Sequence, residues 1–78
     1  MTLPEPLGDR VRRFRMAQGL TQEDLAARMQ TRGHDTIMQP RIAEIELGRR
    51  SLTPEELVDM ARALGVAITE LLGVPDKL

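Results

Sequence analysis

The sequence contains no cysteine, tryptophan or tyrosine, and its only aromatic residue is Phe14. The absence of cysteine excludes a disulfide framework and a cysteine-ligated zinc site, the two devices that stabilise many small domains. Stability must therefore come from aliphatic packing, and 41% hydrophobic residues supply enough side chains for a core. A chain of 78 residues has room for one small domain.

The sequence also lacks the long apolar run of a transmembrane helix. No basic segment followed by an apolar segment opens it, as would be expected of a secretory leader. We therefore expect a cytoplasmic protein with no membrane partner.

Residues for catalysis are scarce. His34 is the only histidine and Ser51 the only serine, so neither a Ser-His-acid nor a Cys-His system can be assembled. The paired acids at 23–24 and 55–56 fall at expected helix starts, where carboxylates stabilise the helix dipole. His34, next to Gly33 in a turn, is expected to face solvent, and it is not expected to bind a metal because no second histidine or cysteine is available. With no glycine-rich phosphate loop either, the sequence predicts no enzyme, no metal and no cofactor.

The net charge of −1 conceals an uneven distribution. Nine arginines face seven acidic residues up to residue 50, whereas two basic residues face five acidic ones from residue 51 onward. A cationic first part and an acidic second part indicate one face suited to an anion and another kept away from it.

The first two helices are marked by their apolar spacing and their caps. A helix is expected from Gly8 to just before Gly19, after an N-terminal tail over residues 1–7. A second is expected over Gln22–Arg32, opened by a capping box and ended by the next glycine. The residues that carry these signals are Leu7, Val11 and Phe14 on the first helix, and Thr21, Asp24 and Gly33 around the second.

A third, short helix is expected at about Met38–Leu47. Asp35 and Thr36 are candidate caps, Pro40 fits the first turn, and Gly48 supplies the stop. Two isoleucines, Ile42 and Ile45, form its buried side.

The fourth helix has the clearest start of all, with Thr53 as N-cap, Pro54 next and Glu56 two residues further on. Gly65 ends it, and a fifth helix over residues 68–72 is closed by glycine before a C-terminal tail at 74–78. No segment alternates like a strand and no repeat is present. The sequence thus predicts an all-α orthogonal bundle over residues 8–73.

The third helix has a composition suited to reading DNA. A short helix on a rigid base can present hydrogen-bonding groups to base edges while its neighbours contact phosphates. Glutamine can read adenine, arginine guanine, and glutamate can accept from cytosine, whereas proline offers only apolar contact, for example to a thymine methyl. The residues left on its outer side and flank are Gln39, Pro40, Arg41, Ala43, Glu44 and Leu47.

Three strings in order, TQEDLAARM, IAEIELGRR and LTPEELVDMARALGVAITELL, resemble the Cro and phage-repressor type of helix-turn-helix protein, the XRE family. The likeness covers about residues 7 to 73. It implies a five-helix lambda-repressor-like bundle whose third helix enters the major groove of double-stranded DNA. It also implies a transcriptional regulator, commonly a repressor and a homodimer.

Position by position, the resemblance implies three groups of residues. Base contacts are implied for Gln39, Pro40, Arg41 and Glu44, and phosphate contacts for Gln22, Ala43, Arg49 and Arg50. A structural ion pair is implied for Arg15 and Glu46, at the ends of the first and third helices.

The sequence departs from the family between Ala26 and Ile42, where it is several residues longer than usual. This lengthening predicts an extra turn on the second helix, through residues 30–32, and a looser turn after it. Pro40 and Glu44 also replace the commoner polar or basic residues of the family.

Some alternatives remain open at this stage. The arginines of the first helix either solvate it or touch phosphate, and the C-terminal apolar residues either form a dimer contact or belong to the core and tail. The acidic fourth helix and the low net charge also allow a protein-interaction module, such as an antitoxin or adaptor, on the same fold. The residues concerned are Arg10, Arg12 and Arg13, then Leu71, Leu72, Val74 and Leu78.

Overall fold

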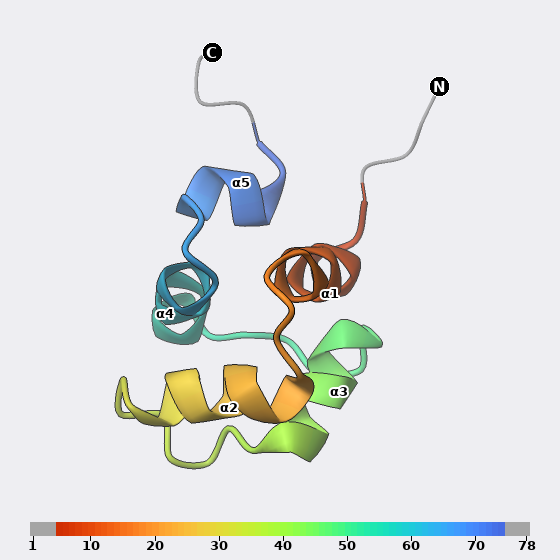
Figure 1. Ribbon diagram of the computed structural model, residues 1–78. Helices are drawn as coiled ribbons and strands as arrows, with labels where there is room; N and C mark the ends of the chain where they lie inside the picture. Colours follow the sequence, from red (N-terminus) through yellow and green to blue (C-terminus); the bar gives the residue numbers. More distant parts are fainter. Residues whose placement is uncertain (1–4, 75–78) are drawn as a thin grey trace.

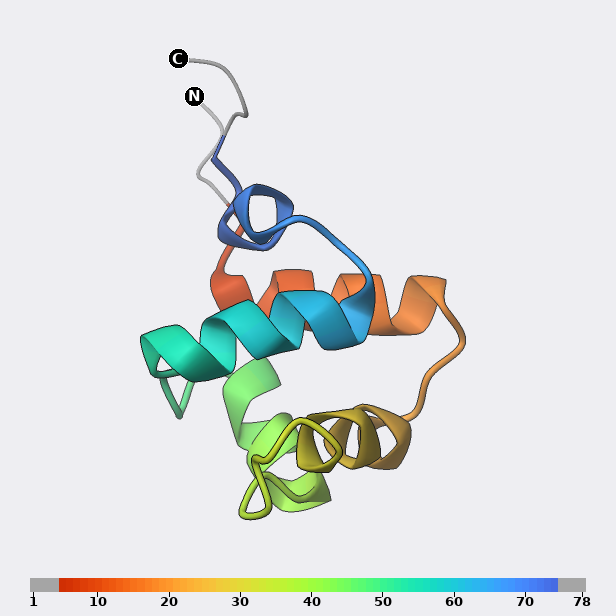
Figure 2. The same ribbon diagram turned by 90° about the vertical axis from the view of Figure 1, so that its left-hand side faces the viewer.

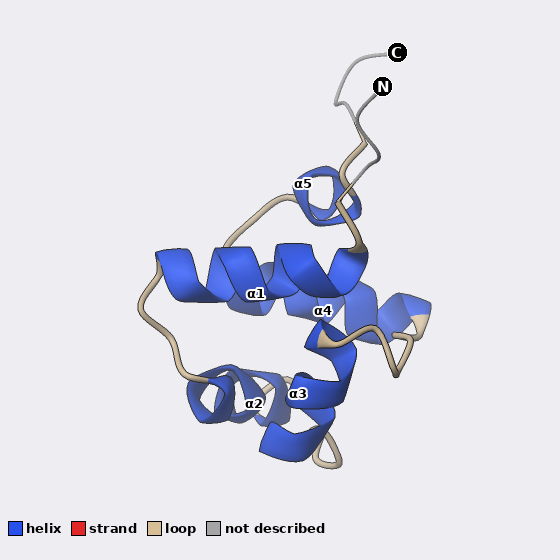
Figure 3. Cartoon of the chain, turned by 90° about the vertical axis from the view of Figure 1, so that its right-hand side faces the viewer, coloured by secondary structure: helices blue, strands red, loops and turns tan. Residues whose placement is uncertain are grey.

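The computed structural model describes residues 5–74 and forms five α-helices over that range (Figure 1). They are α1 (Leu7–Ala17), α2 (Gln22–Gln30), α3 (Gln39–Glu46), α4 (Pro54–Leu64) and α5 (Ile68–Leu72). No strand occurs in the described range (Figure 3), and the predicted all-α five-helix fold is confirmed. Residues 1–4 and 75–78, which include most of both predicted tails and Leu78, lie outside the described residues.

Capping boxes open α2 and α4, as their sequences predict. The Asp24 amide donates to the Thr21 hydroxyl at 3.0 Å, and the Thr21 amide donates to the Asp24 carboxylate at 2.9 Å. These hydrogen bonds lower the pKa of Asp24. At α4 the same reciprocal pair joins Thr53 and Glu56 at 2.9 and 3.2 Å. Both helix starts are therefore fixed by residues close in sequence.

The lengthened segment between α2 and α3 differs from expectation. Helix α2 ends at Gln30, two residues before the predicted end. The amides of Arg32 and Gly33 instead bond to carbonyls three residues earlier, which tightens the chain into a turn that Gly33 closes at φ +91°. Asp35 and Thr36 do not cap α3, because its N-cap is Met38, which makes no side-chain capping bond.

The helices form two layers around one aliphatic core. Helix α2 packs on α3 and α4, α1 packs on α3, α4 and α5, and α5 packs on α4. Figures 1 and 2 show α2 and α3 together at one end of the molecule, with α5 at the other. The side chains with no more than 3% exposure are Val11, Leu25, Ala26, Met29, Ile37, Ile42, Ile45, Met60, Ala61, Ala63, Leu64 and Leu71.

Gly8 sets the distance between α1 and α3. A Cβ atom at this position would lie 2.4 Å from the Ile45 carbonyl oxygen and 2.6 Å from that of Glu46. The absence of a side chain thus lets the start of α1 pack directly on the end of α3.

None of the helices formed by residues 5–74 is long and apolar enough to cross a bilayer.

Candidate nucleic-acid interface

Helix α3 lies with one side in the core and the other at the surface. Ile42 and Ile45 are 0% and 2% exposed, so they fix the helix from beneath. On the opposite side Pro40 is exposed, Glu44 is partly exposed, and Leu47 is 66% exposed. This is the outer face that the spacing of the isoleucines predicts.

A continuous row of hydrogen bonds joins α3 to α2 and α1. The Gln39 amide donates to the Gln22 side-chain oxygen at 2.7 Å, and the Gln22 amide donates to Glu46 at 3.1 Å. Glu46 also accepts two hydrogen bonds from the Arg15 guanidinium, at 2.7 and 3.0 Å. Four residues implied by the family resemblance therefore meet in one network, which fixes the start of α2 against both ends of α3.

The ion pair at the end of this row is shielded from water. The side chains of Arg15 and Glu46 are 12% and 4% exposed. The hydrogen bonds to Glu46 raise the pKa of Arg15, and a third guanidinium hydrogen bond reaches the Leu20 carbonyl at 2.8 Å. The bidentate geometry joins α1, the turn after it and α3.

Arg41 is turned toward α4. Its Nη2 atom donates to Glu56 at 3.0 Å and its Nη1 atom to the Thr36 hydroxyl at 3.3 Å, while its Nε atom is buried without a partner among residues 5–74. The side chain is only 24% exposed. In this arrangement the guanidinium holds α3 to the start of α4 and does not extend outward as a base-reading group.

The basic pair after α3 lies at the surface. Arg49 and Arg50 are both exposed, directly after Gly48, which turns the chain at φ +76°. Arg50 lies 3.9 Å from Glu44, an exposed and loose ion pair. Arg49 has no ion pair among residues 5–74, so one of these two guanidinium groups is entirely available to an anion.

α1 carries four arginines, and apart from Arg15, which pairs with Glu46, two of the remaining three are engaged by the segment before the helix. Glu5 lies 2.9 Å from Arg13 and 3.8 Å from Arg10, and the Arg13 guanidinium also lies 4.6 Å from the centre of the Phe14 ring. The hydrogen bond from Arg13 lowers the pKa of Glu5. Arg10 is itself buried, at 8% exposure.

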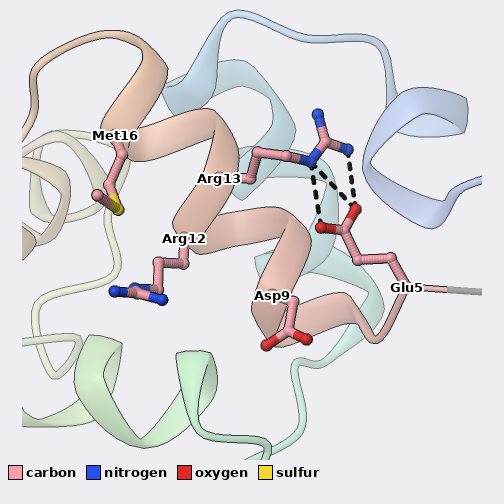
Figure 4. Close-up of a pocket in the computed structure, with 5 residues that line it drawn as sticks. All are labelled: Glu5, Asp9, Arg12, Arg13 and Met16. Carbon is pink, nitrogen blue, oxygen red and sulfur yellow. Dashed lines mark hydrogen bonds and ion pairs between the residues drawn. The ribbon is translucent and has the colours of Figure 1, made fainter.

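Arg12 is the exception among these three arginines. Figure 4 shows it turned away from the pair formed by Glu5 and Arg13, toward the ribbon of α3. Arg12 is exposed and has no ion pair in the described part of the chain. It lines a hollow between α1 and α3 together with Gln22 and Leu47, so it lies beside the outer face of α3.

His34 is not the solvent-facing residue that its turn position predicts. Its Nε2 atom lies 2.7 Å from the Asp59 carboxylate of α4, and its side chain is 16% exposed. The hydrogen bond with His34 lowers the pKa of Asp59. The side-chain amide of Gln30 donates to the Ile37 carbonyl at 3.1 Å, so the long turn is tied to α4 and to the end of α2.

The C-terminal apolar residues divide into two groups. Leu71 is fully buried and belongs to the core, so its candidacy for a dimer contact is wrong. Leu72 and Val74 are 41% and 49% exposed.

No group of three side chains able to ligate a metal comes together within residues 5–74.

Comparison with known proteins agrees with this arrangement. A helix-turn-helix family model matches residues 11–71. The uncharacterised HTH-type transcriptional regulator y4dJ of Sinorhizobium fredii is 34% identical over 77 residues, which cover 99% of this chain and 92% of that protein. No solved structure was found to match. The chain therefore belongs to the helix-turn-helix family, of the Cro and phage-repressor (XRE) type that its sequence motifs resemble.

Proposed function

We propose that this protein is a sequence-specific DNA-binding transcriptional regulator, a cytoplasmic repressor that inserts α3 into the major groove. One observation carries the proposal: the outer face of α3 is exposed at the end of the molecule, while its inner face and both its ends are fixed by the core and by the row from Gln39 to Arg15. A rigid, outward-facing short helix is the element that reads base edges in such folds.

Gln39 is the principal base-reading residue in this proposal. One of its amide hydrogens is used by Gln22, which leaves the other hydrogen and the side-chain oxygen available. An amide hydrogen and an oxygen are the two groups that adenine requires at N7 and N6. Gln22 therefore orients Gln39 without consuming its capacity to read.

The other base contacts follow the outer side of α3. Pro40 offers apolar contact, and Glu44 accepts from a cytosine amino group once Arg50 turns to phosphate. Arg41 can contact a guanine only if it breaks its ion pair with Glu56. It is therefore the weakest candidate among the four implied base-contact residues.

Phosphate contacts surround this face. Gln22 at the start of α2 and Arg49 and Arg50 after α3 supply donors, and Ala43 lacks a donor but allows the backbone of DNA to approach closely. Arg12 is added to this set, because it is the α1 arginine that lies next to α3 and has no acidic partner in the described range.

A homodimer would double these contacts, and this matters for a chain with a net charge of −1. The exposed side chains of Leu72 and Val74 are our candidates for the dimer contact. Leu72 is the last residue of α5 and Val74 follows shortly after it, and α5 lies at the end of the molecule opposite α2 and α3 (Figure 2).

Selection of duplexes from a random pool by the full chain, at two salt concentrations, tests the proposal. We expect an enriched operator whose binding weakens about 5- to 150-fold on Gln39→Ala, since one bidentate base contact is worth roughly 1–3 kcal/mol. Arg62→Ala on the exposed side of α4 is the matched control and should leave binding unchanged.

Failure to enrich any duplex, together with co-purification of a cationic protein, would decide for the protein-interaction alternative. Equal binding of an enriched operator by Gln39→Ala and the parent chain would reject the assignment of α3 as the reading helix.

A further inference from the structure

The line of outward residues on α3 is mostly apolar. Pro40, Glu44 and Leu47 are spaced by four and three residues, so they follow one side of the helix, opposite Ile42 and Ile45. Leu47 has the largest exposed fraction, 66%, among the large hydrophobic side chains of the described chain. Only one of the three outward residues can form a side-chain hydrogen bond.

Met38 is a second exposed apolar side chain, at the start of the same helix. It is 59% exposed and occupies the N-cap, where serine, threonine, aspartate or asparagine would bond to a free amide. Methionine makes no such bond here, so the start of α3 has no side-chain cap and carries an exposed apolar side chain at that position. The two most exposed large hydrophobic residues described thus lie at the two ends of the helix expected to meet DNA.

The polar side chains of α3 are largely engaged within the protein. Gln39 donates one hydrogen to Gln22, Arg41 is held by Glu56, and Glu46 is enclosed by Arg15. The carboxylate of Glu44 is the one charged group left on the outer line, and it is repelled by the acceptor atoms of guanine. The side-chain hydrogen-bonding groups left for bases on this helix are therefore the remaining ones of Gln39 and the carboxylate of Glu44, whereas Met38, Pro40 and Leu47 offer exposed apolar surface.

We infer that α3, besides the hydrogen-bonding contact of Gln39, reads its operator through the C5 methyl groups of thymine, with Met38, Pro40 and Leu47 as the contacting residues. This inference rests on the proposed function. Thymine is the only one of the four bases that presents an apolar group in the major groove. Contact with a methyl group removes exposed apolar surface from water, which favours binding. Guanine and cytosine have no methyl group in the major groove that could make this contact.

Deoxyuridine provides a direct test, because it keeps every hydrogen-bonding atom of thymine and lacks only the methyl group. Each thymine of the selected operator is replaced in turn, and binding of the full chain is followed by fluorescence anisotropy. Burial of a methyl group is worth about a fourfold change in affinity. We expect a loss of that size at each contacted thymine.

The same duplexes are then bound by Met38→Ala and Leu47→Ala. Each variant should bind thymine and deoxyuridine equally at the position that its missing side chain contacts. Val58→Ala, which removes an exposed hydrophobic side chain from α4, should keep the full difference. Melting temperatures within a few degrees of the parent chain would show that the variants are folded, as expected of exposed positions.

The outcomes separate this inference from the proposed function. An operator that binds equally well with deoxyuridine at every position, yet weakens on Gln39→Ala, overturns the thymine reading and leaves the regulator intact. If Met38→Ala and Leu47→Ala leave operator binding unchanged and instead abolish self-association in sedimentation, the apolar ends belong to a second copy of the chain and the inference is wrong. If no duplex is enriched, both fail together.

Discussion

At the scale of single residues, Glu46 has the most demanding environment. Its carboxylate is almost fully enclosed and accepts hydrogen bonds from Arg15 on α1 and Gln22 on α2. Removing it would leave a guanidinium with little access to water and no counterion, and would free Gln22 from its orientation. One side chain therefore supports both stability and the placement of Gln39.

We expect Glu46→Ala to lower the free energy of unfolding by about 3–5 kcal/mol, the range measured when one partner of a buried pair is removed. Glu44→Ala is the control on the same helix, because its ion pair with Arg50 is exposed and 3.9 Å long, and should cost less than about 1 kcal/mol. Urea denaturation measures both values. Equal decreases in the free energy of unfolding of the two variants would show that the buried ion pair stabilises the fold no more than the exposed one.

The pair of His34 and Asp59 predicts a dependence of stability on pH. Hydrogen bonding lowers the folded pKa of Asp59 below its ordinary value of 3.8, so the folded state favours the charged carboxylate. The stability that this provides is complete above the ordinary pKa and is lost as the pH falls through the lowered one. Asp59→Asn should therefore show a flatter decrease in melting temperature between pH 5 and pH 2.

Glu55→Gln, an exposed position on the same helix with no ion pair within the described range, is the control for that titration. The melting temperature of Glu55→Gln should decrease between pH 5 and pH 2 as that of the parent chain does. An Asp59→Asn curve parallel to the parent curve across the whole acid range would contradict the role of the His34 contact.

At the scale of helices, the close approach of α1 to α3 depends on Gly8. Gly8→Ala would bring a Cβ atom to 2.4 Å from a backbone carbonyl, which cannot rotate away as a side chain could. We expect a loss of about 1–3 kcal/mol, typical of overpacking, although alanine is the better helix former. Asp9→Ala, on the exposed side of the same turn, should cost less than about 1 kcal/mol in the same denaturation experiment. A stabilised Gly8→Ala would contradict the packing described.

The uncapped start of α3 predicts a conflict between stability and binding. Met38→Ser supplies the missing cap and should raise the free energy of unfolding by about 1 kcal/mol. The same change should weaken operator binding, because it removes an apolar contact. Met16→Ser, at an exposed methionine inside α1, should give no gain in stability and no loss of binding. Met38→Ser that binds the operator as tightly as the parent would contradict the assigned contact.

Helix starts and stops could be predicted where their signals are local. The boxes at Thr21 and Thr53 and the glycine after α4 placed those boundaries correctly, because their partners lie within four residues. The start of α3 was predicted to within one residue, with Pro40 in its first turn, but the two candidate caps, Asp35 and Thr36, are not used.

The candidate site shows the same division. Its outer face followed from the spacing of Ile42 and Ile45, and the family resemblance pointed to the pair of Arg15 and Glu46. The partners of Arg41 and His34 lie on α4, 15 and 25 residues away, and nothing in a local pattern specifies such contacts. Long-range side-chain pairing depends on how the helices cross, which the helix signals alone do not determine.

At the scale of the whole molecule, the charges are arranged around the end formed by α2 and α3. The exposed arginines Arg12, Arg49 and Arg50 lie around this end or beside it, whereas the acidic second part of the chain forms α4 and α5. A small number of well-placed cations can thus bind phosphate although the net charge is −1.

This arrangement predicts different roles for two neighbouring arginines. Arg12→Ala should lower the slope of log K against log salt concentration by about 0.9, the value for one phosphate contact. Arg13→Ala should leave the slope unchanged, because that guanidinium faces Glu5 on the other side of α1 (Figure 4). Titrations at three or more salt concentrations measure both slopes. A larger effect of Arg13→Ala would contradict the orientation assigned to the two side chains.

The central claim, that the outer face of α3 meets DNA, is tested most directly by NMR titration of the isotope-labelled full chain with its selected operator. We predict that amide shift changes concentrate at the start of α2, over α3 and at Arg49 and Arg50, and that residues 55–62 of α4 remain unshifted. Changes centred on α4, with α3 unaffected, would contradict the account.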